Sequence, residues 1–265
     1  MLFPLADRPA RLVLAAMLVA IVFATAACSP TKAELTDPVE ILQAGAASLG
    51  DMKSFHLRGA VDGEIPLSIG GGGGTPLSID GTTLDGDIDV AAGELAVEVL
   101  VTSIVTLRVN LVVADGSAYL RAPLLTGDSW VRQPGEGGIG ADPGAAIGGL
   151  SAFLAQPDLK PEKLTDTRCA GTDCYSVRFT VPASDVQAAL GSLASSIPGL
   201  SGDAVGDVTV TVGVRKDNQQ LATIGLEIPA GGAKPLTIEL VLSKVDEPVT
   251  ITPPPADQVK DASGG

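Results

Sequence analysis

Aromatic side chains are scarce in this sequence, whose 265 residues include five Phe, two Tyr and one Trp. Histidine is scarcer still, because His56 is the only one. A hydrolytic triad would have to use this residue, but in Phe55-His56-Leu57 the alternating pattern turns it to the polar side, as a solvated or turn-capping histidine. The Gly-x-Ser-x-Gly motif of many hydrolases does not occur either. We therefore expect a protein that is not an enzyme and needs no cofactor.

Positive charge is the second shortage, with 17 Lys and Arg against 31 Asp and Glu and a formal net charge of −14 at pH 7. A surface of this sign repels the phosphates of nucleic acids and of anionic lipid headgroups. Nucleic acid is therefore excluded as a partner, and the body of the protein is expected to stand off an acidic membrane.

The only long apolar run lies at the N-terminus, where two arginines precede it and small residues end it. This is typical of a secretory signal peptide and too short for a membrane-spanning helix. Thr25-Ala26-Ala27-Cys28 resembles the bacterial lipobox, whose cysteine is lipidated and becomes the first mature residue. We expect residues 1–27 to be a lipoprotein signal peptide, Cys28 to anchor the chain outside the cell membrane, and residues 28–36 to form a flexible tether. The alternative is ordinary secretion with cleavage after Ala27.

The other two cysteines, Cys169 and Cys174, are separated by four residues in a turn between polar and strand-like segments. In an exported protein such a pair is expected to form a local disulfide that closes a hairpin. Two thiols are too few for a zinc site, and no further ligand stands nearby in the sequence. The sequence therefore predicts a disulfide here and no metal.

Two glycine-rich segments need an interpretation. Residues 135–140, Gly-Glu-Gly-Gly-Ile-Gly, match the dinucleotide-binding string, but that motif needs a βαβ unit and a helix that opens on the phosphate. Here Asp142 caps the next helix and Glu136 would repel phosphate. The segment is therefore interpreted as a flexible loop or as a mobile lip at the mouth of a cavity. Residues 70–74 are expected to form a slack hairpin tip.

Three helices and many strands are expected. The first helix begins at Asp37-Pro38-Val39-Glu40, which supplies an N-cap, a proline and an acid, and it ends at Gly50. The others are Pro143–Ala155 and about 183–196. Strands are expected at 54–65, 76–90, 94–101, 104–113, 117–122, 129–133, around 163–181, and at 207–216, 219–229 and 236–245. The Pro-rich residues 251–265 are expected to be disordered, which leaves 37–250 as one domain.

Hydrophobic alternation gives the fold class. From Leu95 to Val113 every odd position except Ser103 is a branched aliphatic, and the last three strands repeat the pattern. Short turns between such strands give an antiparallel sheet with one apolar face, and a sheet of about ten strands curls. We therefore expect an α+β fold in which helices close the concave apolar face of a strongly curved antiparallel sheet. With so few aromatic rings, the helices either fill that face or leave a cavity for apolar ligands.

Several stretches, in their order, resemble the actinobacterial LppX/LprG family of lipoproteins. They are the lipobox at Cys28, DPVEILQAGAASLGDMKSFHLRGAVDG, GDIDVAAG, VNLVVADGSAYLRAPL, GDSWVRQPG and DPGAAIGGLSAFLAQ. The resemblance implies a LolA/LppX-like, U-shaped half barrel that holds an acylated lipid or glycolipid and carries it across the cell envelope, with a membrane lipid transporter as a further partner. The IGGGGGTPLSI insertion and the Cys169–Cys174 pair depart from the family pattern.

The lining of such a lipid cavity is expected to come from the apolar positions of the alternating strands. These positions are Leu95, Val97, Val99, Val105, Leu107, Val109, Leu111, Val210, Val212, Ile224, Leu226, Ile238 and Leu240. The alternative from another class is an envelope scaffold with a filled core, which contacts a transporter or a cell-wall component.

Overall fold

The computed structural model describes residues 33–67, 75–103, 106–134, 142–182, 206–229 and 234–262. The chain divides into two compact units, Met1–Ala33 and Glu34–Gly265, and the elements below belong to the second unit. None of the helices within the described ranges is long and apolar enough to cross a lipid bilayer.

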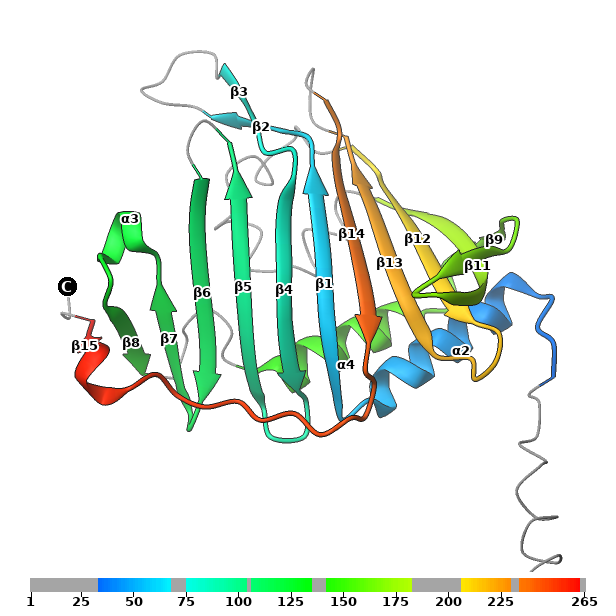
Figure 1. Cartoon of the computed structure of the whole chain (residues 1–265). Coiled ribbons are helices and arrows are strands. Elements are labelled where there is room, and N and C mark those ends of the chain that lie inside the picture. The colour runs from blue at the N-terminus through cyan, green and yellow to red at the C-terminus, as the bar shows by residue number, and fades with distance from the viewer. Residues whose placement is uncertain are drawn as a thin grey trace, which may run out of the picture. The chain divides into compact units, whose positions relative to one another are not determined.

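One large sheet organises the second unit (Figure 1). Its order is β10-β11-β12-β13-β14-β1-β4-β5-β6-β7-β8-β15, and β9 pairs with β11 beside this path. The strands are β1 (Ser54–Asp62), β4 (Thr82–Asp89), β5 (Glu94–Thr102), β6 (Thr106–Ala114), β7 (Ser117–Arg121), β8 (Trp130–Pro134), β9 (Glu162–Lys163), β10 (Thr167–Cys169), β11 (Thr172–Val181), β12 (Val208–Arg215), β13 (Leu221–Ile228), β14 (Leu236–Ser243) and β15 (Val259–Asp261). Among these described strands, β8 and β15 pair in parallel and all other pairs are antiparallel.

Smaller elements stand beside the sheet. Strands β2 (Glu64–Leu67) and β3 (Thr75–Ser78) form a separate hairpin. They flank the glycine run at 70–74, which itself lies outside the described residues. A short helix, α3 (Pro123–Thr126), follows β7, and the 3-10 turn η1 (Ala256–Gln258) precedes β15.

Two longer helices lie on the same face of the sheet (Figure 1). Helix α2 (Pro38–Asp51) begins as predicted, because the Asp37 carboxylate accepts a hydrogen bond of 2.7 Å from the N–H of Val39. Helix α4 (Pro143–Leu154) begins at Asp142, which caps the N–H of Ala145 in the same way. The two helices pack on each other. The third predicted helix, at about 183–196, lies outside the described residues.

The hydrophobic core forms where α2 meets strands β11, β12 and β13. A methyl group on Gly45 of α2 would lie 2.8 Å from Val214 of β12, so this glycine lets the helix approach the sheet closely. Phe55, Tyr175 and Phe179 bring aromatic rings into this cluster. Two further buried aromatic residues, Tyr119 and Trp130, lie at the other end of the sheet, on β7 and β8.

The prediction of a disordered tail over 251–265 is wrong for its middle part, because Val259–Asp261 is strand β15. Val259 pairs with Trp130, and the Asp261 carboxylate lies 2.7 Å from the Arg132 guanidinium. Strand β8 would otherwise be an open sheet edge, and its free backbone groups offer a partner to any nearby segment. Composition alone could not predict this pairing between distant segments.

These elements confirm the predicted α+β class, with a strongly curved sheet and helices on one of its faces (Figure 1). The sheet is antiparallel, as predicted, apart from the β8–β15 pair. It is also open, since its described path ends at β10 and β15 and does not close on itself.

Candidate functional site

Strand register places the predicted lining residues on a common face of the sheet. Directly paired residues of antiparallel strands project to the same side. One such row crosses eight strands through Val109, Val99, Leu84, Gly59, Leu240, Ile224, Val212 and Val177. A neighbouring row runs through Val131, Leu120, Leu111, Val97, Gly86, Leu57 and Leu242. The helices cover this face, because Val212 and Ile224 belong to the core that contains α2.

The β11–β14 end of this face is filled. Val212 has no exposed surface, and Val210 and Ile224 are each 5% exposed. Leu226, Ile238 and Leu240, which were predicted as lining, are partly buried and pack against the same core. The first three side chains are therefore core residues in this structure, because a buried side chain has no surface left for a ligand.

The β5–β6 end of the same face is only half covered. Five of the predicted lining residues are partly exposed there, and within the described ranges they do not join the core around α2. We call them the β5–β6 strip: Val97, Val99, Leu107, Val109 and Leu111. Leu95, at the end of β5, does pack against the core. Val105 lies outside the described residues.

Two glycines shape this face in the middle of the sheet. A methyl group on Gly86 would lie 2.5 Å from the carbonyl oxygen of Ala96 and 2.9 Å from the Cα of Val97. A methyl group on Gly59 would lie 3.0 Å from Leu240. Glycine in a strand marks a tight bend or a close approach of a neighbouring backbone. Both glycines therefore sit where neighbouring strands leave no space for a side chain, beside the β5–β6 strip.

The opposite, outer face carries a polar ladder. Arg58, Asp85, Glu98, Asn110 and Arg121 follow one another in direct register across β1, β4, β5, β6 and β7. Arg58 contacts Asp85 at 3.3 Å, Asn110 donates to Glu98 at 2.9 Å, and Arg121 donates to Asn110 at 3.0 Å. One face is therefore apolar and the other is polar across the middle of the sheet.

His56 belongs to this outer face, but it is not the solvated or turn-capping histidine that the sequence predicted. It is 9% exposed, and its Nδ1 atom lies 2.8 Å from the carboxylate of Asp87 on the next strand. Asp85 lies 3.5 Å from the Nε2 atom. The two aspartates cover the ring because they stand at adjacent outer-face positions of β4. This arrangement ties β1 to β4.

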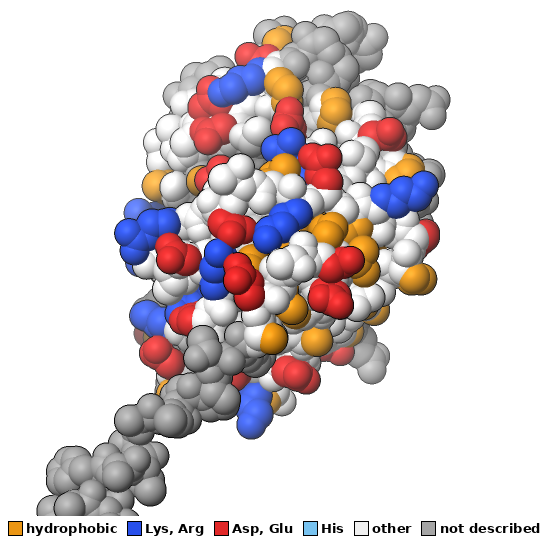
Figure 2. All heavy atoms as spheres, turned by 90° about the vertical axis from the view of Figure 1, so that its right-hand side faces the viewer, with side chains coloured by type: hydrophobic (Ala, Val, Ile, Leu, Met, Phe, Trp, Pro, Cys, Tyr) orange, Lys and Arg blue, Asp and Glu red, His pale blue; other side chains and the backbone are white. Residues whose placement is uncertain are grey.

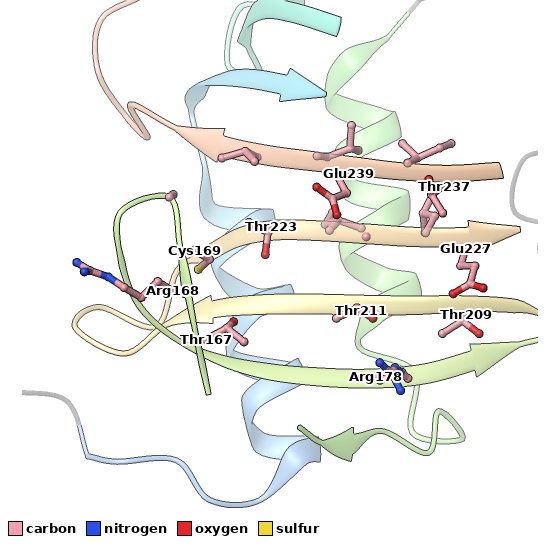
Figure 3. A pocket seen from close by; sticks show the side chains of 17 residues that line it. Thr167, Arg168, Cys169, Arg178, Thr209, Thr211, Thr223, Glu227, Thr237 and Glu239 are labelled. Carbon is pink, nitrogen blue, oxygen red and sulfur yellow. The ribbon is translucent and has the colours of Figure 1, made fainter. Parts of the chain in front are cut away.

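A hollow of about 490 Å³ lies on the outer face over β12–β14 (Figure 3). Thr209, Thr211 and Thr223 project into it beside Glu227 and Glu239. Ile224, Leu226, Ile238 and Leu240 border it too, but the alternation of strand side chains turns their apolar groups to the helix face. The labelled side chains that project into this hollow are mainly threonine and glutamate, although the lining as a whole is about half apolar. The hollow was not predicted, although the alternating threonines were visible in the sequence.

The β10–β11 hairpin closes one end of this hollow (Figure 3). Cys169 and Cys174 form the predicted disulfide across it. Both cysteines pack on Ala222, and a methyl group on Gly213 would lie 3.5 Å from the Cys169 sulfur. Gly213 on β12 and Ala222 on β13 thus leave space for the disulfide to pack against the sheet. Within the described ranges, no three His, Cys, Asp or Glu side chains gather as they would around a metal ion.

Known proteins resemble this chain in fold rather than in sequence. No family model matches the chain, and no curated protein matches its sequence. LprF from Mycobacterium bovis matches in structure with a TM-score of 0.56 at 19% identity, over 83% of this chain and 98% of LprF. The Mycobacterium tuberculosis lipoprotein LppX matches with a TM-score of 0.53 at 17% identity, over 82% of this chain and 100% of LppX. The chain therefore has the fold of the mycobacterial lipoproteins LprF and LppX, as its resemblance to the LppX/LprG family implied.

Proposed function

We propose that this protein is a lipid-anchored, extracytoplasmic lipoprotein that binds an acylated lipid or glycolipid and carries it across the cell envelope. Cys28 is its anchor to the outer side of the cell membrane, after removal of residues 1–27. A membrane lipid transporter supplies or receives the cargo. The proposed role is binding and release, without a catalytic step.

The β5–β6 strip carries the proposal. Its five aliphatic side chains lie on the helix-covered face. They are partly exposed, because the described core around α2 does not include them. Acyl chains offer the matching surface, and apolar burial yields about 25 cal/mol per Å². Two chains that bury several hundred Å² would contribute on the order of 10 kcal/mol before the cost of association. The proposed lining of the lipid-binding site is therefore this strip and its neighbours. Val210, Val212 and Ile224 belong to the hydrophobic core instead.

The competing function is that of an envelope scaffold whose apolar face is filled throughout. The packed β11–β13 end favours this reading for part of the sheet, since α2 fills it without a ligand. A lipid carrier purified from its own cell envelope would contain bound lipid, whereas a scaffold with a filled core would contain none.

Native mass spectrometry on the mature chain, expressed in an actinobacterial host, tests the proposal. The protein is measured before and after extraction with organic solvent. We expect a removable mass that matches an acylated lipid, and we expect the extracted protein to take up added lipid. An unliganded mass in both samples, with no uptake, would support the scaffold.

A further inference from the structure

The residues just before α2 are fixed to the body of the protein. The backbone N–H of Leu35 donates a hydrogen bond of 3.0 Å to the hydroxyl of Tyr175, and the Leu35 side chain packs against the hydrophobic core. Lys163 and Lys216 lie over the Tyr175 ring, 5.3 and 5.1 Å from its centroid. The prediction of a flexible tether over 28–36 is therefore wrong at Leu35, because a distant tyrosine holds it.

We propose that this attachment turns the end of the body around Tyr175 toward the bilayer, so that a lipid surface is the docking partner of that end. The inference rests on the lipid anchor of the proposed function. Cys28 stands seven residues before Leu35. An extended chain spans at most about 3.6 Å per residue, so the seven residues from Cys28 to Leu35 can span about 25 Å at most. As a flexible coil this segment would average about 15 Å.

Charge at this end suits contact with headgroups. We call it the tethered end: residues 162–166, the β10–β11 hairpin, the β12–β13 turn and the start of α2. Its ion pairs are Lys163–Asp166 at 3.9 Å, Lys216–Asp166 at 2.6 Å, Arg178–Glu162 at 4.0 Å and Arg215–Asp217 at 3.0 Å. Figure 2, seen from this side, shows cationic and anionic side chains interspersed. These paired charges reduce the repulsion that the net charge of −14 causes for the chain as a whole, and Asp37 and Glu40 at the start of α2 are acids that none of these pairs includes.

Two of these pairs shift the pKa of one partner in the direction that favours its charged form. The Asp166 carboxylate, which accepts a hydrogen bond from Lys216, raises the pKa of that lysine above its ordinary value. Arg215, which hydrogen-bonds Asp217, lowers the pKa of that carboxyl. Both groups therefore remain charged over the whole physiological range.

The opposite end of the sheet provides a reference point. β8 is nine strand-to-strand steps from β11 in the sheet order, which is about 43 Å along the curved sheet at about 4.8 Å per step. Figure 1 shows β8 and the start of α2 on opposite sides of the second unit. Trp130, in β8, is the only tryptophan of the chain, so its fluorescence reports on the far end.

The experiment attaches the mature chain to phosphatidylcholine vesicles through Cys28 and a maleimide-bearing lipid. Cys28 is the only cysteine outside the Cys169–Cys174 disulfide, so the coupling is specific. Val39, in the first turn of α2, is 40% exposed and accepts a reporter there. Because Trp130 is only 8% exposed, quenching by nitroxide-labelled headgroups is compared between two exposed reporters in the Trp130→Phe background, Val39→Trp and Leu124→Trp, the latter in α3 at the far end. We expect quenching of the Val39→Trp protein to be several-fold stronger.

Equal quenching of the two proteins, or stronger quenching of the Leu124→Trp protein, would overturn the proposal. Tyr175→Phe keeps the ring but removes the hydroxyl that accepts from Leu35, and it is expected to reduce the difference; an unchanged difference would contradict the role of this contact. If Trp130→Phe unfolds the chain, Val39→Trp alone is read after subtraction of the native signal. Chemical coupling makes the result independent of native lipidation and of cargo binding, which native mass spectrometry tests separately.

Discussion

Val99 and Val109 lie directly opposite each other on β5 and β6, and both side chains remain partly exposed. Farther along the same row of the sheet, Val212 is completely buried beneath α2. The same type of residue on the same face is thus core at one end and accessible at the other. This contrast separates the part of the sheet that stabilises the fold from the part that is proposed to hold a lipid.

Val109→Trp should block lipid uptake and leave the fold intact. The indole would occupy the space that the proposed acyl chain needs, since Val109 is partly exposed in the middle of the β5–β6 strip. The matched control is Val112→Trp, because Val112 is also partly exposed but stands on the opposite face of the same strand. Uptake is measured with a fluorescent acyl lipid, and folding by circular dichroism.

Loss of folding in the Val109→Trp protein, with the Val112→Trp protein folded, would mean that the strip is a filled core. Equal uptake by both variants and the native protein would place the lipid elsewhere.

The two ends of the apolar face should differ in their contribution to stability. Val212→Ala removes two methyl groups from a fully buried site, and such a truncation lowers the free energy of unfolding by about 2 kcal/mol. Val99→Ala acts on a partly exposed side chain, and the expected loss is below about 1 kcal/mol. Urea denaturation of the lipid-free proteins measures both. Equal losses would contradict the division of this face into core and strip.

Gly86→Ala should destabilise the protein and weaken lipid binding together. The added methyl group would lie 2.5 Å from the carbonyl oxygen of Ala96, so the backbones of β4 and β5 have to move apart beside the β5–β6 strip. We expect a loss of about 1–3 kcal/mol in the free energy of unfolding. Gly225→Ala is the control, because its methyl group would come no closer than 3.7 Å to any neighbour. A neutral Gly86→Ala variant would show that the close approach of β4 and β5 at this position is not needed.

Removal of the C-terminal strand should expose Trp130. A chain that ends at Pro255 lacks β15, which pairs with β8 and places Val259 beside Trp130. Trp130 is 8% exposed in the intact protein, so its emission is expected to shift to longer wavelength after truncation. A chain that ends at Ala262 keeps the strand and is the control. The same emission from both truncated proteins would mean that β15 does not cover this edge.

Local features were predictable from the sequence because their causes are local. Asp37 and Asp142 cap the helices that follow them, through backbone groups two or three residues away. The alternation between Leu95 and Val113 assigned side chains to the correct face, because a strand has a period of two whatever it packs against. The Cys169–Cys174 disulfide was predictable for the same reason, since its two ends lie on one hairpin.

Features that depend on distant partners were not predictable. Val212 and Val99 stand in strands with the same alternation of apolar and polar residues. The sequence of neither strand therefore indicates which of the two valines α2 will cover. His56 is buried by aspartates on another strand, Leu35 is held by Tyr175, and Val259 pairs with Trp130. In each case the partner is far away in the sequence, and only the topology of the sheet brings the two residues together.

Photo-crosslinking with an acyl lipid that carries a diazirine in its chain tests the lipid-binding proposal most directly. The lipid-free mature protein is loaded with this probe, irradiated, and digested for mass spectrometry. We expect crosslinks on the β5–β6 strip, at Val97, Val99, Val109 or Leu111, and their loss in the Val109→Trp protein. Crosslinks confined to the outer face, around Thr211 and Thr223, or no saturable crosslinking at all, would contradict lipid binding on the apolar face.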